Sequence, residues 1–293
     1  MQSPKEFCED EYRDYIVYTA LSEVEKNDER KKILQQLAAA EHKHYTFWSS
    51  KADGYKPHVN RLVIKFIVLL RFLFGLMFTL KLLERHESEV IKGYKSYLLK
   101  LEGDERRKLE EIIKEEEEHE SYFMSQIDET VVKYMSFIVL GLADAIVEIT
   151  GVHAGFLGVT SSTLIAGVAG LIVGFAAAIS MASAAYLQAK HDVKRSPMIS
   201  AITTGASYIC AVAFLALPYF LTHDMIYAFT GSLILAILLT AAFTFYGAVI
   251  NDKSFSREFI ESTALIMGTA AATFLFGEFL GDFFGIKQAV SLF

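Results

Sequence analysis

Between Ile149 and Ala189 the chain contains no Asp, Glu, Lys or Arg over 41 consecutive residues. About 20 apolar residues of helix cross the hydrocarbon core of a bilayer, so this run is about twice as long as one crossing needs. The polar stretch 160–163 lies inside the run and predicts a hairpin. The run therefore indicates a membrane protein with two adjacent membrane-spanning helices.

Further apolar segments extend this pattern on both sides. Uncharged runs cover residues 196–222 and 225–251, and a last one begins after Glu261 and reaches Gly277. With residues 134–157 counted as the first span, the sequence predicts five transmembrane helices. Because five is an odd number, the two ends of the chain should lie on opposite sides of the membrane.

Basic residues are concentrated in alternate loops. Lys190, Lys194 and Arg195 lie between the second and third spans, and Lys253 and Arg257 lie between the fourth and fifth. Loops rich in Lys and Arg stay on the cytoplasmic side. We therefore expect a multi-pass protein of the cell membrane, with its N-terminal half in the cytoplasm and its C-terminus outside.

The remaining charge lies mostly in the first half of the chain. Residues 1–133 hold 22 Lys/Arg and 26 Asp/Glu, whereas residues 134–293 hold only 6 and 9. The net charge is −7, and the densest basic cluster is 106–108, so the sequence argues against a nucleic-acid partner. The first ten residues are polar and acidic, so we expect no cleavable secretory signal.

Two acidic residues lie inside the first predicted span. Asp144 and Glu148 are four residues apart on one helix face, and each costs about 2.5–3.5 kcal/mol at a helix centre. Asp144 lies ten residues inside Tyr134, too deep for a side chain that merely reaches the head groups. The pair predicts a cation pathway. Met181 on the second span is a candidate thioether ligand for a transition metal, although a membrane methionine is more often only packed.

Glycines recur on the first two spans at a spacing that suits close helix contact. Gly151 and Gly155 lie on the first, and Gly167, Gly170 and Gly174 lie on the second. Such small-residue faces bring helices together inside a bundle or across a homodimer. The alternative is that glycine is simply common in membrane helices.

The charged half has the pattern of helical hairpins. Residues 7–50 predict two helices with a turn near 27–28, and residues 79–128 predict two more with a turn near 102–104. Two helical hairpins form a four-helix bundle. The predicted fold class is therefore all-α, with a cytoplasmic four-helix bundle followed by a five-helix transmembrane domain.

Two metal-ligand motifs lie on the second and fourth of these helices. They are Glu41-x-x-His44 and Glu116-x-x-His119, a spacing that points a carboxylate and an imidazole the same way. The acidic run 115–118 is also typical of a solvated helix face. Two such motifs on the helices that a bundle requires favour a metal site over chance.

The helix register places the candidate ligands in one layer. Glu11 and His44 are each 16.5 residues from the centre of the first turn, and Glu87 and His119 are each 16 residues from the second, with Glu84 one turn beyond Glu87. At 1.5 Å per residue this layer lies about 24 Å from the turns. The sequence therefore predicts that these side chains share one metal cluster.

An apolar segment with basic residues connects the two hairpins. Residues 61–83 are rich in Phe and Leu but contain Lys65, Arg71 and Lys81. A membrane crossing here would place the two hairpins on opposite sides and separate the ligands. We expect the segment to lie along the membrane surface, in contact with lipid.

These motifs resemble known families. Residues 8–128 resemble the rubrerythrin branch of the ferritin-like superfamily. The di-iron ligand pattern of that family matches four features in order: Glu11 seven residues before Tyr18, Glu41-x-x-His44, Glu84-x-x-Glu87 and Glu116-x-x-His119. The resemblance implies that residues 1–130 form a ferritin-like domain with a di-iron site. The ligands it implies are Glu11, Glu41, His44, Glu84, Glu87, Glu116 and His119.

The second half resembles the vacuolar iron transporter family. The likeness rests on the stretch 140–148 of the first span and on 180–182 of the second. It implies that residues 131–293 form a transporter domain in which Asp144, Glu148 and Met181 line the pathway. A fusion of these two families resembles the membrane-bound ferritin-like proteins, which implies a dimeric exporter of ferrous iron, or manganese, that exchanges the ion for protons.

The sequence departs from both families. It has no C-x-x-C motif, so the electron-donating domain usual in rubrerythrins is missing from this sequence. Only residues 190–197 fill the gap where plant-type transporters carry an acidic insert, and Ala185 stands where relatives often have Glu. Two alternatives to transport therefore stay open: a membrane-anchored ferroxidase or peroxide-scavenging enzyme, and a metal sensor that gates the membrane domain.

Overall fold

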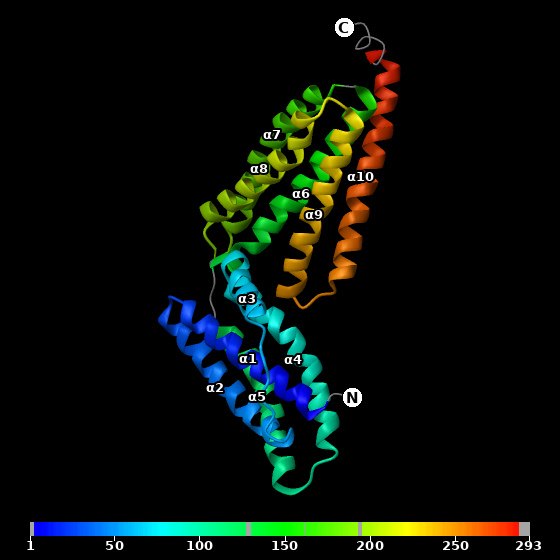
Figure 1. The fold of residues 1–293 in the computed structure, drawn as a ribbon. Helices are drawn as coiled ribbons and strands as arrows, with labels where there is room; N and C mark the ends of the chain where they lie inside the picture. The colour runs from blue at the N-terminus through cyan, green and yellow to red at the C-terminus, as the bar shows by residue number, and fades with distance from the viewer. Residues whose placement is uncertain (1–2, 127–129, 161, 193–194, 287–293) are drawn as a thin grey trace. The chain divides into compact units, whose positions relative to one another are not determined.

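The computed structural model describes residues 3–126, 130–160, 162–192 and 195–286. Within these residues the chain forms ten α-helices and no strand (Figure 1). The chain divides into two compact units, residues 1–129 and 130–293. The predicted all-α class is therefore confirmed, and each unit is described by itself below.

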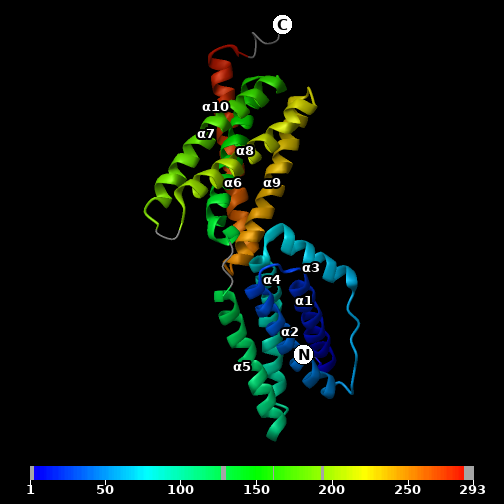
Figure 2. The same ribbon diagram turned by 90° about the vertical axis from the view of Figure 1, so that its left-hand side faces the viewer.

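The first unit contains five helices: α1 (Pro4–Val24), α2 (Asp28–Lys51), α3 (Arg61–Phe74), α4 (Leu76–Leu98) and α5 (Gly103–Gln126). A capping box between Ser3 and Glu6 begins α1, and the side chain of Asn27 caps α2. Figures 1 and 2 show α1 and α2 running side by side. The predicted hairpin over 7–50 corresponds to α1 and α2, and that over 79–128 to α4 and α5.

An aromatic cluster holds the helices of this unit together. Phe7 of α1 packs on Trp48 of α2 and on Tyr94 of α4, with ring centroids 4.5 and 4.8 Å apart. Leu109 and Ile112 bring α5 into the same core. Four helices therefore share one set of buried side chains, and Trp48, the only tryptophan in the sequence, lies at its centre.

The apolar connector is divided at Gly75. This residue has φ +89, which glycine adopts without strain, and it ends α3 and precedes α4. The predicted surface segment 61–83 therefore falls into two parts: residues 76–80 are largely buried, whereas α3 exposes Leu62, Phe66, Leu69, Phe72 and Leu73. Arg71 of α3 binds Glu25, next to the α1–α2 turn, at 2.7 Å.

The second unit contains five long apolar helices: α6 (Thr130–Val159), α7 (Thr163–Ala189), α8 (Pro197–Leu221), α9 (Met225–Ile250) and α10 (Phe255–Phe283). Each is long and apolar enough to cross a membrane, so the five predicted spans are confirmed as helices. Ser162 caps α7 in the predicted hairpin, and Asp224 caps α9. This unit has the composition and length of a membrane-spanning domain.

Glycines bring the helices of this unit into close contact. On α6, a side chain at Gly141 would overlap the backbone of Thr204 on α8, and one at Gly158 would lie 2.7 Å from the backbone of α10. Gly277 of α10 faces the backbone of Gly155 in the same way. The small-residue faces thus act within the bundle, and α6 contacts α8 near one end and α10 near the other.

Candidate metal centre

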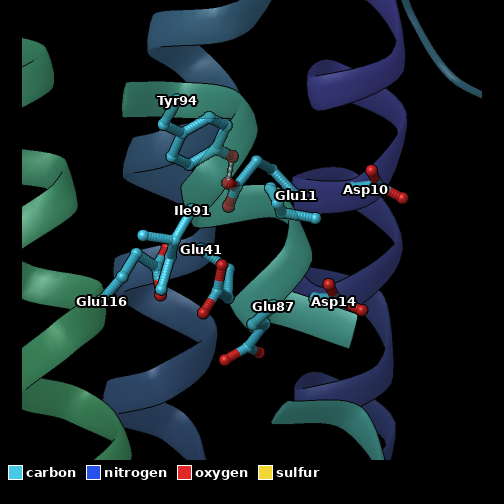
Figure 3. Close-up of a pocket in the computed structure, with 9 residues that line it drawn as sticks. Asp10, Glu11, Asp14, Glu41, Glu87, Ile91, Tyr94 and Glu116 are labelled. Atoms are coloured by element: carbon cyan, nitrogen blue, oxygen red, sulfur yellow. Dashed lines mark hydrogen bonds between the residues drawn. The ribbon is translucent and has the colours of Figure 1, made fainter. Parts of the chain in front are cut away.

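Four of the predicted ligands converge inside the first unit. Glu11 of α1, Glu41 and His44 of α2, and Glu116 of α5 each offer a donor atom within 4.8 Å of the others, and all four side chains are buried. Figure 3 shows the three carboxylates turned toward a common space. The cavity they help to line has a volume of about 10 Å³, room for about one water-sized particle.

His44 lies at the centre of the group. Its Nδ1 atom is 2.7 Å from Glu116, 3.6 Å from Glu11 and 3.8 Å from Glu41. Its Nε2 atom is 3.0 Å from Glu115, on the side away from the cluster. Metal-binding histidines commonly donate their second ring N–H to a carboxylate, which fixes the ring orientation. Glu115 therefore has the position of a residue that orients a ligand.

The other three predicted ligands differ in placement. Glu87 of α4 lines the same cavity, and its carboxylate accepts a hydrogen bond of 3.0 Å from Tyr18. Glu84 is half-buried one turn earlier on α4, and its charge acts on both Glu87 and Tyr18. The side chain of His119 lies outside the described residues. A second ion position built from these three stays a prediction.

Sequence reasoning missed two residues beside the cluster. Tyr94 of α4 donates a hydrogen bond to Glu11 (Figure 3). Its position seven residues after Glu87, two helical turns along the same face, was a usable signal. Glu115 belongs to the acidic run that is also typical of a solvated face, yet it contacts the buried ring of His44 and accepts a hydrogen bond from Lys43 at 2.6 Å.

Burial among like charges changes the proton affinity of the cluster. Removal from water, together with the charge of Glu116, raises the pKa of Glu11 to about 7 despite the nearby imidazole. Burial, together with the charges of Glu116 and Glu11, raises the pKa of Glu41 well above its ordinary value. For His44, burial opposes protonation, but the neighbouring carboxylates of Glu11, Glu116 and Glu41 outweigh this effect and raise its pKa. Without an ion, the cluster therefore retains protons near neutral pH.

The donor set fits a divalent transition metal ion. Three carboxylates and one imidazole suit Mn²⁺, Fe²⁺ and Zn²⁺, and by themselves do not select among these ions. Among the described residues, the Oε2 atom of Glu11 is buried and accepts no hydrogen bond. A cation would satisfy this oxygen and offset the mutual repulsion of the glutamates. The first unit therefore contains a group that could hold a metal ion.

The predicted acidic pair of the second unit lies on α6. Asp144 and Glu148 are half-buried, one turn apart, and Tyr208 of α8 donates a hydrogen bond to Glu148. Met181 of α7 packs against the hydrophobic cluster that contains Ile149 and Tyr208. The pair thus lies beside a polar contact with a neighbouring helix, in a unit made of apolar helices.

No protein-family model matches the chain, and no curated protein matches it.

Proposed function

We propose that this protein exports a divalent transition metal ion, ferrous iron or manganese, from the cytoplasm across the cell membrane in exchange for protons. One observation carries the proposal: a single chain holds a buried cluster of three carboxylates and an imidazole, and also an acidic pair on a helix long enough to span a membrane. Either feature alone has simpler explanations, such as a structural metal site or a polar helix contact. Together they give one ion two sets of suitable oxygen ligands.

In this proposal the first unit is a cytoplasmic ferritin-like four-helix bundle, and its cluster captures the ion. Because the pKa of Glu11 is about 7, the ion competes with protons at neutral pH, and binding releases protons from Glu11, Glu41 and His44. Glu115 and Tyr94 hold their partners in the cluster by hydrogen bonds. Capture should therefore weaken as the cytoplasm becomes acidic.

Passage through the membrane falls to the second unit, which acts as a homodimer in this proposal. The carboxylates of Asp144 and Glu148 bind the ion, and they take up protons when it leaves. The hydroxyl of Tyr208 positions Glu148. Exchange of a doubly charged ion for protons at the same oxygens limits the unpaired charge held among apolar helices.

Transport by the full-length protein in proteoliposomes tests this proposal. Asp144→Asn and Glu148→Gln should abolish Fe²⁺ or Mn²⁺ flux while the metal content of the first unit stays unchanged. Glu261→Gln is the matched control, because Glu261 is an exposed acid of α10 that pairs with Arg257. Wild-type flux in the Asp144→Asn variant would remove the acidic pair from the mechanism.

A second candidate function is a membrane-anchored ferroxidase or peroxide-scavenging enzyme. Two tyrosines favour it, because Tyr18 and Tyr94 each donate a hydrogen bond to a carboxylate that lines the cluster cavity, where a redox-active side chain could serve. Oxygen or peroxide consumption by the iron-loaded protein tests this function. Turnover that persists in Asp144→Asn but disappears in Glu116→Gln would support the enzyme, and no turnover with iron bound would exclude it.

A further inference from the structure

The second unit buries an ionisable residue that is not Asp, Glu, Lys or Arg and so did not interrupt the uncharged run of the sequence. His153 is on α6, inside the uncharged run, and its side chain is 0% exposed. Ionisable side chains inside membrane-spanning segments are expensive to bury and usually serve ion or proton movement. Neither the proposed ion pathway nor the helix contacts described above use this residue.

The helices around His153 leave room for its ring. On α7, a side chain at Gly170 would overlap the imidazole Nε2 atom, so only glycine fits there. The Nδ1 atom is 3.4 Å from the hydroxyl of Ser232 on α9, and the ring centroid is 4.1 Å from that of Tyr219 on α8. The imidazole therefore lies in a space bounded by four helices.

Two polar atoms in this space make no hydrogen bond with a described residue. They are the Nε2 atom of His153 and the hydroxyl oxygen of Tyr219, and both are buried. An unsatisfied polar atom in an apolar interior costs about 1–3 kcal/mol, so such atoms need an explanation. Among the described residues, Gly170, Tyr219 and Ser232 face the imidazole, and none of them carries a charge. A divalent ion would find no carboxylate among them, whereas a proton needs only the ring nitrogen.

The position of His153 along α6 relates it to the acidic pair. It lies five residues beyond Glu148, a rise of about 7.5 Å, and six residues before Val159, where α6 ends. Along the helix axis, His153 is therefore between the carboxylates and the end of the unit where α6 and α7 join, on a different face of α6 from Glu148.

We propose that His153 relays protons between that end of the membrane unit and the carboxylates of Asp144 and Glu148. One ring nitrogen takes up a proton, an imidazolium forms transiently, and a proton then leaves toward the acids, so that the ring returns to its neutral form. Tyr219 and Ser232 are positioning residues that hold the ring in place. The inference rests on the proposed exchange of metal for protons and names a residue of its proton path.

Mn²⁺ flux in proteoliposomes tests the relay in two modes. In His153→Gln, flux driven by a pH gradient should fall by about 100-fold, while Mn²⁺–Mn²⁺ exchange at equal pH should stay within about twofold of wild type. His223→Gln is the matched control, because His223 is exposed in the loop between α8 and α9. Gradient-driven flux retained in His153→Gln would overturn the relay, and so would equal loss of both modes.

A second measurement uses no metal and decides the inference even if the proposed export fails. Infrared spectra of the full-length protein in bilayers should show the C=O band of protonated carboxyl groups after an acid jump, with the band assigned by its loss in Asp144→Asn and Glu148→Gln. In His153→Gln this band should appear about 100-fold more slowly than in wild type, whereas in His223→Gln it should appear at the wild-type rate. An undelayed band would refute the relay. A delay in His153→Gln, together with wild-type protein that transports no Mn²⁺, would refute only the export function.

Discussion

Replacement of Glu11 by glutamine should stabilise the metal-free first unit while it weakens metal binding. A glutamine has the shape of a protonated glutamate, and its oxygen can still accept the hydrogen bond from Tyr94. The substitution removes one negative charge from a buried group that contains Glu41 and Glu116. Function and stability should therefore change in opposite directions.

The magnitude follows from the pKa of Glu11. Burial raises it from an ordinary 4.5 to about 7, and each pKa unit corresponds to about 1.36 kcal/mol. Between these two values the folded protein binds more protons than the unfolded chain, so the free energy of unfolding decreases as pH rises. The carboxyl group of Glu11 thus destabilises the metal-free protein by about 3 kcal/mol at pH 8, but by only about 1 kcal/mol at pH 5, where it is mostly protonated in the folded state.

Urea unfolding followed by tryptophan fluorescence measures this difference. Trp48 is the only tryptophan and is buried in the first unit, so its emission reports the unfolding of that unit in the full-length protein. With metal removed by a chelator, Glu11→Gln should be more stable than wild type by about 3 kcal/mol at pH 8, and this gain should shrink toward pH 5. A variant that is less stable at pH 8, or a gain that does not depend on pH, would refute the electrostatic reasoning.

Three further predictions concern other contacts. Glu115→Gln should lower the Mn²⁺ affinity of the first unit about 10-fold, because His44 would lose the carboxylate that orients its ring. Glu110→Gln, an exposed change on the same helix, should leave the affinity unchanged. Calorimetric titration measures both. Gly277→Ala should destabilise the second unit by about 1–3 kcal/mol, because the new side chain would meet backbone atoms of α6. Gly268→Ala should not, because its side chain would point into open space. Unfolding in detergent compares the two variants. A nitroxide label at Leu69 tests whether α3 contacts lipid, once the exposed Cys210 has been replaced. In liposomes the label should be more accessible to oxygen, which dissolves in lipid, than to a water-soluble nickel chelate. The reverse order would place α3 in water.

The membrane-length helices were the most predictable part of the fold. A span must be long and apolar, and these two requirements can be counted in a sequence. The exception is α10, which begins at Phe255 and continues to Phe283, whereas the prediction gave only 262–277. Arg257 and Glu261 explain the earlier start, because they form an exposed ion pair within the helix and so need not precede it.

The metal-ligand group was predictable in register but not in detail. Helical rise is constant, so counting from the turn placed Glu11 and His44 in one layer, and their donor atoms lie 3.6 Å apart. The contacts of Tyr94 and Glu115 depend on side-chain rotamers and helix tilt, which no residue count contains. The break at Gly75 was missed for a related reason: the apolar pattern continues through it, and only the backbone φ marks it.

The glycine contacts of α6 restrict how the second unit could open to two sides in turn. A helix whose backbone touches α8 near one end and α10 near the other cannot slide or rotate without separating both pairs. The carboxylates of Asp144 and Glu148 on α6 would thus stay fixed, and the neighbouring helices would have to move around them. By contrast, α7 and α9 meet α6 through side chains such as Ile149 and His153 rather than backbone to backbone, which makes these two helices the natural moving parts.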